Sequence, residues 1–431
     1  MRPADLIIEN AAQVLTLSAG KSAVQAEEKL AIVANGSIGI ARDRILWVGP
    51  HGRVSQDVDL TENCRRIDAS GKIVLPGFID PHTHLVFAGT REKEFELRLQ
   101  GATYQEIAAQ GGGIKSTVQR TRQAGKEELF EVGKRRLDQM ISLGTTTVEA
   151  KSGYGLSLKD EIKMLEVLRD LDQTHAVDVV PTFMGAHEIP PEYAGKKEDY
   201  VRLVIEEMIP AVAEKKLAVF CDVFCEQGVF SPEESRRILE AGKRYGLEAK
   251  IHADELTSLG GAELAAELGA VSADHLLFAS DPGIGSLADK GVVATLLPGT
   301  AFFLFLGRYA PARKMIARGV TVALASDFNP GSCMTPSLPL ITTIACTQMR
   351  MTPAEAILGI TLNAAMALKK EKEIGSLEPG KQADLVVLDI PDYRHLSYHF
   401  GINHVWKVVK KGKVVFENIG RVLFDNAIPS V

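Results

Sequence analysis

The sequence lacks a cysteine framework, a membrane-length hydrophobic run and any block of like charge. Its five cysteines form no Cys-x-x-Cys pair, and an odd number of thiols argues against a set of disulfides. We therefore expect reduced thiols in a cytoplasmic protein. The apolar run Gly291–Gly307 is interrupted by Pro298-Gly299 and is shorter than the ~20 residues of a spanning helix. The amino-terminal segment MRPADLIIEN carries acidic residues where a secretory signal needs an apolar stretch, so we expect neither a signal peptide nor a membrane helix.

The charge balance is mildly acidic and excludes several classes of partner. Lys and Arg number 49 against 55 Asp and Glu, a net charge of −6. This balance argues against a protein built to bind nucleic acid or anionic lipid. The 45% of hydrophobic residues among the 431 of the chain suffice for a large core. We expect a globular protein that binds a small molecule, with no nucleic-acid or membrane partner, and that forms a homodimer.

Both ends of the chain have the pattern of short β-strands separated by turns. Near the amino terminus lie DLIIEN, QVLTL, LAIVANGSIGIA and RILWVGP, and near the carboxyl terminus lie ADLVVLDI and VWKVVKKGKVVFEN. Asn35-Gly36 and Lys410–Lys413 are the expected turns of antiparallel hairpins. Because neither end has enough strands to close a core alone, residues 1–74 and 374–431 are predicted to form one small discontinuous β-domain, similar to a β-sandwich.

The middle of the chain, residues 75–373, alternates buried strands with amphipathic helices. Eight strand-like runs occur: FIDPHTHLVF, TTTVEAK, VDVVPTFMGAH, AVFCDVFCE, EAKIHADE, AVSADHLL, VVATLLPG and TVALASDF. This rhythm favours parallel strands joined by helical crossovers, and eight of them predict an α/β fold, a TIM-like (β/α)8 barrel. An open doubly wound sheet is disfavoured because no G-x-G-x-x-G follows the first strand.

Polar residues gather at the carboxyl ends of these runs, which form one face of a barrel. His82 and His84 are two residues apart, so on a strand both side chains point the same way. His252 and Asp327 end the fifth and eighth runs on the same face. Three imidazoles and one carboxylate suit Zn²⁺ or a similar divalent ion with a position left for water. The His-x-His pair alone is equally compatible with two ordinary polar loop residues, and the four residues together leave zinc, iron and manganese open.

Several motifs resemble the amidohydrolase superfamily of metal-dependent hydrolases: GFIDPHTH, KIHADE, ADH, ASDFNPG and GSLEPGKQADLVVLD. Within it, the chain is similar to the imidazolonepropionase family over essentially its whole length. The segments that carry this resemblance are HLVFAGTREKEFELRLQGATYQEIAAQGGGI, EAKSGYGL, TFMGAHEIPPEY, HADELTSLGGAELAAELGAVSADHL and ASDFNPGS. The resemblance implies hydrolysis of 4-imidazolone-5-propanoate to N-formimidoyl-L-glutamate in histidine degradation, with one metal ion per chain, zinc or iron in a divalent or trivalent state.

The resemblance also assigns roles to individual residues. The expected metal ligands are His82, His84, His252 and Asp327. The expected catalytic residues are Glu255, His275, Asp327 and His187. The expected substrate-binding residues are Arg91, Tyr154, His187, Glu255, Asn329, Gly331 and Ser332.

For some of these residues the chemistry of the side chain also supports the assigned role, and each has an alternative role that is purely structural. Arg91 offers the bidentate geometry that a propionate needs, or it forms a surface salt bridge with Glu92 or Glu94. Glu255, three residues past His252, can move protons between water and the leaving nitrogen, or it opens the following helix.

For three further residues the alternative is equally plain. Tyr154 lies between two glycines that let a ligand approach the backbone, or it anchors a loop. His187 can bond to the imidazolone oxygen, or it is a structural histidine. His275, at the end of the sixth run, can polarise a substrate oxygen or orient Asp327.

Two motifs point to chemistry that we do not expect. Gly111–Ser116 resembles a phosphate loop, but Lys does not follow the last glycine directly and no strand precedes it. Lys151 invites comparison with the carboxylated lysine that bridges two metals in hydantoinase-like relatives. That lysine belongs to the fourth strand, where this chain has Glu226, so a single metal is expected. A deaminase of the same superfamily and a ligand-binding barrel without turnover are the competing functions.

Overall fold

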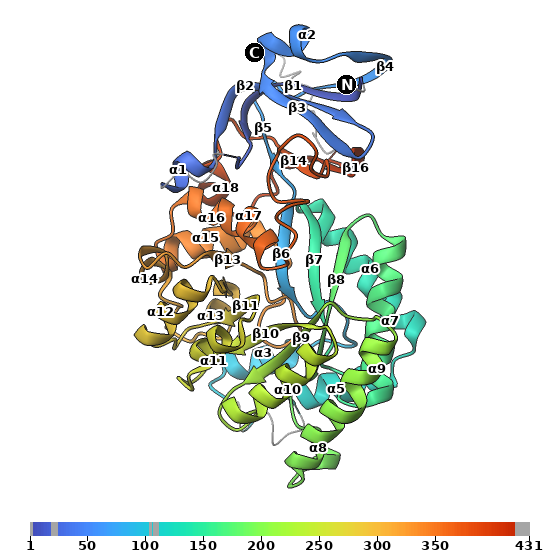
Figure 1. The fold of residues 1–431 in the computed structure, drawn as a ribbon, viewed down its shortest axis with the longest axis vertical. Helices are drawn as coiled ribbons and strands as arrows, with labels where there is room; N and C mark the ends of the chain where they lie inside the picture. Colours follow the sequence, from blue (N-terminus) through green and yellow to red (C-terminus); the bar gives the residue numbers. More distant parts are fainter. Residues whose placement is uncertain (1–2, 19–24, 103–105, 107–111, 419–431) are drawn as a thin grey trace, which may run out of the picture.

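The computed structural model describes residues 3–18, 25–102, 106 and 112–418. The central strands form a parallel barrel (Figure 1). Each strand pairs in parallel with the next along the chain. The eight strands are β6 Phe78–Thr83, β7 Thr145–Lys151, β8 Asp178–Ala186, β9 Phe220–Cys225, β10 Glu248–Ala253, β11 Ser272–His275, β12 Val293–Leu296 and β13 Val322–Leu324.

The last strand returns to the first through the segment that follows β13. A parallel bridge joins Thr83 to Phe328, and the Asp327 amide donates to the His82 carbonyl over 3.1 Å. The eight predicted strands are therefore confirmed as a nearly closed (β/α)8 barrel.

Helices lie between the strands and around the barrel (Figure 1). Two of them begin at a serine that caps the first turn. The Ser157 hydroxyl accepts from the Asp160 amide at the start of α7, and Ser231 and Glu234 form a capping box at the start of α10. The helices are α1 Ala26–Lys29, α2 Val54–Asp57, α3 Glu92–Leu99, α5 Ile114–Gln123, α6 Lys126–Ser142, α7 Leu158–Thr174, α8 Lys197–Leu203, α9 Ile209–Glu214, α10 Pro232–Arg244, α11 Gly261–Leu268, α12 Asp281–Lys290, α13 Pro298–Phe303, α14 Ala312–Ala317, α15 Leu338–Met349, α16 Pro353–Gly359, α17 Leu362–Met366 and α18 His395–Tyr398.

Strands from both ends of the chain share a second sheet, as predicted. In Figure 1 its blue amino-terminal strands lie beside red carboxyl-terminal ones. Its order is β16-β15-β14-β5-β1-β2-β3, with β4 paired to β1. Most pairs are antiparallel, but β1 runs parallel to β4 and β5. The strands are β1 Ala4–Leu15, β2 Ile32–Ala41, β3 Arg44–Pro50, β4 Leu60–Asp68, β5 Ile73–Pro76, β14 Leu385–Leu388, β15 Val405–Lys410 and β16 Lys413–Glu417.

One of the two predicted hairpin turns is confirmed and the other is wrong. Lys411 and Gly412 connect β15 to β16 with φ of 48° and 74°, the backbone of a two-residue type I′ turn. Asn35-Gly36 lies inside β2 instead, and the chain turns after Ala41, where Arg42 has φ of 56°. Gly36 is required there for space, because an added Cβ would lie 2.6 Å from Val14 Cγ2 on the neighbouring strand.

The terminal sheet lies against the amino ends of the barrel strands. β14 pairs with β5, and β5 leads through Gly77 into β6. The buried Lys410 ammonium of β15 lies 2.6 Å from carboxylate oxygens of both Asp384 and Asp178, the first residue of β8. The carboxyl ends of the barrel strands therefore point away from the terminal sheet (Figure 1).

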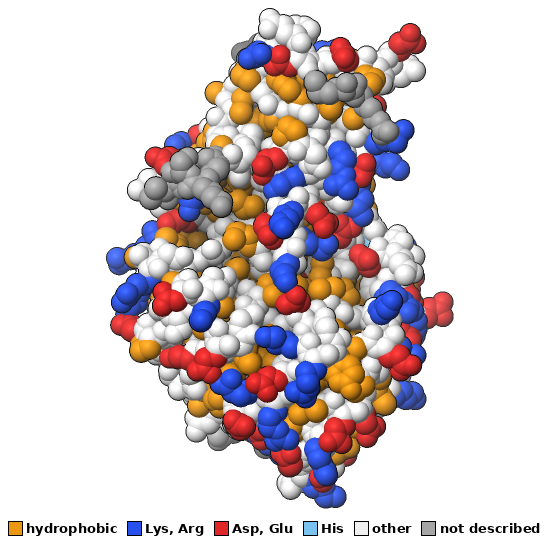
Figure 2. Space-filling model, in the orientation of Figure 1, with side chains coloured by type: hydrophobic (Ala, Val, Ile, Leu, Met, Phe, Trp, Pro, Cys, Tyr) orange, Lys and Arg blue, Asp and Glu red, His pale blue; other side chains and the backbone are white. Residues whose placement is uncertain are grey.

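The face seen in Figure 2 carries Lys and Arg side chains interspersed with Asp and Glu. Within the described residues, the structure contains no helix with the length and hydropathy needed to cross a membrane.

Candidate active site

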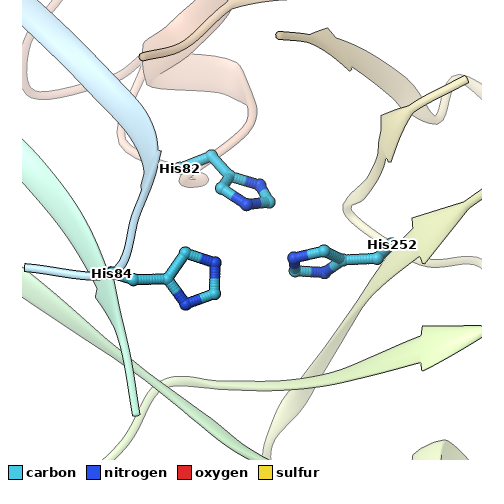
Figure 3. A group of neighbouring side chains, drawn as sticks. All are labelled: His82, His84 and His252. Atoms are coloured by element: carbon cyan, nitrogen blue, oxygen red, sulfur yellow. The ribbon is translucent and has the colours of Figure 1, made fainter. Parts of the chain in front are cut away.

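Three histidines meet at the carboxyl ends of two barrel strands. His82 is the next-to-last residue of β6, His84 follows the strand directly, and His252 lies near the end of β10. Their rings turn toward one another (Figure 3). One ring nitrogen from each lies within 4.8 Å of the others. All three side chains are buried, so the polar atoms of the rings face one another and not solvent.

Asp327 and His275 complete a second group with His82, again with ligand atoms within 4.8 Å. Asp327 Oδ1 lies 3.5 Å from His82 Nε2 and 3.6 Å from His84 Nε2. The other oxygen, Oδ2, accepts from the Thr300 hydroxyl at 2.6 Å. Burial raises the pKa of Asp327 to about 6. Both Asp327 and His275 have positive φ, 53° and 75°, a strained backbone of the kind that collects at functional sites.

Several ring nitrogens at this centre have no hydrogen-bond partner in the described part of the chain: His82 Nε2, His84 Nδ1 and His275 Nδ1. Burial lowers the pKa of all three imidazoles well below its usual value, which favours neutral rings with a free lone pair. A buried polar atom without a partner costs free energy. Of these three atoms, His82 Nε2 faces Asp327 Oδ1, so its lone pair is available to a cation at this centre.

Carboxylates hold two of the three rings from behind. His82 Nδ1 lies 2.6 Å from Asp274 Oδ2, and His252 Nδ1 lies 3.1 Å from Asp222 Oδ1. Because Nδ1 of each ring faces a carboxylate, Nε2 is the nitrogen that remains for a metal ion. Sequence reasoning missed Asp222 and Asp274; the available signal was an acidic residue inside an apolar strand run, in VFCDVFC and VSADH.

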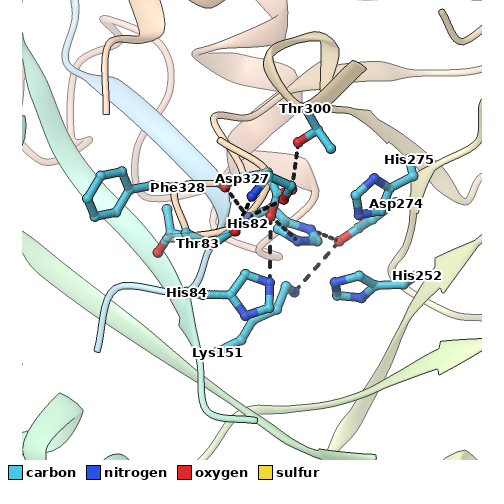
Figure 4. A network of polar contacts seen from close by, with 12 residues as sticks. His82, Thr83, His84, Lys151, His252, Asp274, His275, Thr300, Asp327 and Phe328 are labelled. Carbon is cyan, nitrogen blue, oxygen red and sulfur yellow. Dashed lines mark hydrogen bonds and ion pairs between the residues drawn. The ribbon is translucent and has the colours of Figure 1, made fainter. Parts of the chain in front are cut away.

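Lys151 lies below the histidines inside the barrel (Figure 4). Its ammonium is 2.7 Å from Glu149 Oε1 and 2.7 Å from Asp222 Oδ2, and 3.7 Å from Asp274 Oδ2. Burial alone would lower the pKa of Lys151, but the three carboxylates outweigh it and raise the pKa above its usual value. Lys151 is therefore a charged group at the centre of an ion cluster.

Glu255 faces the cavity beside His275, with its Oε2 at 3.5 Å from His275 Nε2. Burial, with the nearby Asp327 and Glu226 carboxylates, raises the pKa of Glu255 well above its usual value. The structural role considered for Glu255 is filled by its neighbour Asp254, whose carboxylate accepts from four amides at 2.9–3.1 Å at the start of α11, those of Leu259, Gly260, Gly261 and Ala262.

His187 and Gly153 form one wall of the site. His187 Nδ1 donates to the Gly153 carbonyl over 3.0 Å, and its ring stacks on His84 with 4.9 Å between centroids. Burial lowers the pKa of His187 to about 3, so the ring is neutral and Nε2 is an acceptor. Gly153 has φ of 98°, and a Cβ there would lie 2.9 Å from His187 Nδ1. Tyr154 is buried behind, 5.6 Å from the His84 ring.

Arg91 lines the cavity and also forms the predicted alternative contact. Its Nε and Nη2 lie 2.8 and 2.7 Å from Glu94 Oε2. Its Nη1 passes Gly331 so closely that a Cβ on Gly331 would lie 2.1 Å away. Glu94 thus fixes the guanidinium on one side while Nη1 lies along the wall.

Asn329 shapes the loop after Asp327. Its Oδ1 accepts from the Gly331 and Ser332 amides, both at 2.8 Å, and its amide nitrogen donates to the Asp327 carbonyl at 2.7 Å. The Ser332 hydroxyl lies 3.3 Å from Asp327 Oδ2. The structure therefore brings Gly331 and Ser332 to the cavity with Asn329 behind them.

The cavity has a volume of about 480 Å³. Most predicted site residues line it, whereas His82, Tyr154 and Asn329 lie behind its wall. Sequence reasoning missed Arg98, which stacks on Phe303 and donates to the Gly331 carbonyl. The lining residues are His84, Arg91, Glu94, Arg98, Ala102, Ile114, His187, Phe224, His252, Glu255, Leu256, His275, Leu304, Phe305, Leu306, Asp327, Gly331 and Ser332.

The chain is similar to known proteins over nearly its whole length. The Amidohydrolase family profile matches residues 65–123 and 111–416. An imidazolonepropionase of Geobacillus sp. (strain WCH70) is 55% identical over 98% of this chain and 100% of its own length. One from Geobacillus kaustophilus (strain HTA426) is also 55% identical, with the same coverage. Among solved structures, an adenosine deaminase from Xanthomonas campestris with bound zinc superposes with a TM-score of 0.70 at 18% identity, covering 96% of this chain and 93% of its own.

Proposed function

This chain belongs to the imidazolonepropionase family of the amidohydrolases, and we propose that it hydrolyses 4-imidazolone-5-propanoate to N-formimidoyl-L-glutamate in histidine degradation. The observation that carries the proposal is a cavity lined by His84, His252, Asp327 and Glu255 with His82 directly behind its wall, in a chain that matches these relatives over its length. The deaminase alternative rests only on structural likeness at 18% identity.

The site residues fit a single divalent metal ion. His82, His84 and His252 each offer a ring nitrogen and Asp327 offers one carboxylate oxygen, a donor set that zinc and iron both accept. The unpartnered Nε2 of His82, within the described residues, supports this assignment, as does the zinc in the structural neighbour. When bound, the ion supplies the positive charge that makes water a nucleophile near neutral pH.

Glu255 handles the proton in this proposal. Its carboxylate faces the cavity next to His275 and Asp327, within reach of a water that attacks the imidazolone carbonyl. Glu255 takes the proton of that water and returns it to the ring nitrogen that leaves when the C–N bond breaks. A raised pKa suits a carboxyl that both accepts and donates a proton near neutral pH.

Arg91 and His187 orient the substrate. The Arg91 guanidinium is fixed by Glu94 and borders the cavity. It can therefore bind the propionate, which is the anionic end of the substrate. His187 presents Nε2 because its Nδ1 is bound to Gly153. The ring of the substrate then lies between His187 and His275, with its carbonyl toward the metal ligands.

The test is loss of imidazolonepropionate followed by ultraviolet absorbance, with metal analysis of the same purified sample. We expect turnover and about one divalent metal per chain. His252→Ala should lose most of the metal and nearly all activity, because it removes one of the ligands. His399→Ala, an exposed histidine outside the barrel, is the matched control and should keep both. Full metal content and turnover in His252→Ala would overturn the ligand assignment.

A further inference from the structure

A cluster of fully buried charges lies directly beneath the three histidines. It contains Lys151 and Glu149 of β7, Asp222 of β9 and Asp274 of β11, each with a side chain that is 0% exposed. The Lys151 ammonium is within 2.7 Å of two of the carboxylates and 3.7 Å from the third. The proposed reaction uses none of these four groups.

Two of these carboxylates contact different ligand histidines. The Asp222 carboxylate binds Lys151 through Oδ2 and His252 Nδ1 through Oδ1. The Asp274 carboxylate binds His82 Nδ1 through the same oxygen that faces Lys151. Lys151 is therefore linked to each ring through one carboxylate. The centroids of the two rings are 4.5 Å apart, although the rings come from strands on different sides of the barrel.

The Lys151 ammonium also supplies the positive charge that balances the buried carboxylates. Carboxylates taken out of water must be paired, and removing one partner leaves an uncompensated charge in the interior. Without Lys151, the Asp222 and Asp274 carboxylates would repel each other and turn away from their present positions. The Lys250 ammonium also lies 4.0 Å from Asp274 but donates to the Pro81 carbonyl. Among the described residues, Lys151 is the lysine that contacts both Asp222 and Asp274.

We propose that Lys151 is a positioning residue of the metal centre: by binding the Asp222 and Asp274 carboxylates together, it fixes the rings of His252 and His82 so that both Nε2 atoms face one point. This inference rests on the proposed metal site. Lys151 acts through carboxylates and touches neither substrate nor metal. It therefore has a role unlike that of the carboxylated lysine of two-metal relatives.

The test measures Zn²⁺ affinity, by competition with a chromophoric chelator, and the visible spectrum of the Co²⁺-substituted protein, which reports the arrangement of the ligands. Partners that orient metal-binding histidines typically contribute 10–100-fold to metal affinity. Lys151→Met should therefore bind Zn²⁺ about 10–100-fold more weakly than the wild type and show an altered Co²⁺ spectrum. Lys151→Gln, which keeps one hydrogen-bond donor without the charge, is measured alongside and should also lose affinity.

Lys410→Met is the matched control. Lys410 is another buried lysine between two carboxylates, Asp178 and Asp384, but it lies at the other end of the barrel. Lys410→Met should lose stability in urea and keep the wild-type Zn²⁺ affinity and Co²⁺ spectrum, because its carboxylates hold no ligand histidine.

The outcomes separate this inference from the proposed function. If the wild type binds no Zn²⁺ stoichiometrically, the proposed metal centre itself fails. If the wild type binds Zn²⁺ and Lys151→Met keeps the same affinity and spectrum, only the positioning role is overturned. If neither Lys151 variant folds while Lys410→Met does, the role of Lys151 is structural and the positioning role is likewise rejected.

Discussion

Asp254 and Glu255 are consecutive carboxylates with different surroundings. Asp254 accepts four amide hydrogen bonds and fixes the loop that leads into α11. Glu255 is buried at the cavity, where its Oε2 lies 3.5 Å from His275 Nε2. Because Asp254 binds the backbone amides, the Glu255 carboxylate is left to face the cavity.

Glu255→Gln should lower kcat by about 10²–10⁴-fold, the usual contribution of a general acid–base group. Glutamine keeps the size of the side chain but cannot take up the proton. Metal content and substrate Kd should change little, because neither depends on proton transfer. Stopped-flow turnover and metal analysis of the same sample check this. A near-normal kcat would transfer the base role to Asp327 or His275, and loss of metal would make Glu255 a ligand.

Arg91→Lys should lower kcat/KM, and Arg91→Ala should lower it further. Lysine keeps the charge but not the planar fork that binds a carboxylate in two places. The loss should appear mainly in KM, since the propionate is bound in both ground and transition state. Arg120→Lys, an exposed arginine near the same loop, should leave both constants unchanged. Unchanged kcat/KM in Arg91→Ala would place the propionate elsewhere.

The residues that sequence reasoning found and missed differ in a physical way. Strand-like runs end at or near His82, His84, His252 and Asp327. In a barrel the ends of such runs lie on one face, so the sequence alone predicts that these residues lie together. The contacts of Asp222 with His252 and Lys151 depend on which way each side chain turns inside the barrel. No spacing in one strand specifies a contact between two strands, so the ion cluster could not be predicted.

Individual helices and strands follow the preferences of their local sequence wherever tertiary packing does not oppose them. α7 and α10 begin at the serines that cap them, and the barrel strands occupy the apolar runs. Asn35-Gly36 shows the opposite case. Its turn preference is overridden because Gly36 is needed for close approach to Val14 of β1, a tertiary requirement that the dipeptide does not reveal.

The junction between β8 and β15 depends on one carboxylate, and it predicts a pH dependence of stability. Asp178 lies 2.6–2.7 Å from the ammonium groups of Lys410 and Lys411. Burial alone would raise the pKa of Asp178, but the two lysines outweigh it and lower the pKa below its usual value. The folded state thus holds the carboxylate ionised more strongly than the unfolded chain does. Its stabilisation is present above about pH 4 and is lost as the pH falls through the folded pKa.

Asp178→Asn should lower the free energy of unfolding by about 1.5–3 kcal/mol at pH 7, the range for hydrogen bonds to charged groups. The difference from the wild type should shrink as the pH falls below about 4. Urea titrations over this pH range measure it. Asp138→Asn, at an exposed carboxylate, should show little difference at any pH. A constant Asp178 difference down to low pH would mean that the interaction is not ionic.

At the scale of the whole molecule, the barrel converts distant sequence positions into one site. β6, β10 and the segment after β13 each contribute metal-binding candidates, and the terminal sheet holds the opposite end of the barrel. This division agrees with the sequence pattern, in which strand-only segments flank an alternating one. It leaves the face that carries the chemistry free of the second sheet.

A bound metal should therefore stabilise the whole molecule, because its ligands join strands far apart in the sequence. A ligand that binds only the folded state adds about 2.7 kcal/mol to the free energy of unfolding at 100 times its Kd. We expect a chelator to lower the Tm of the wild type and added Zn²⁺ to restore it. His252→Ala should respond weakly to both treatments because one ligand is gone, whereas His399→Ala should respond as the wild type does. If the wild type has the same Tm with and without chelator while metal analysis shows that the ion has left, then the ion binds the unfolded chain as well as the folded one, and the three histidines are not a metal site that the fold creates.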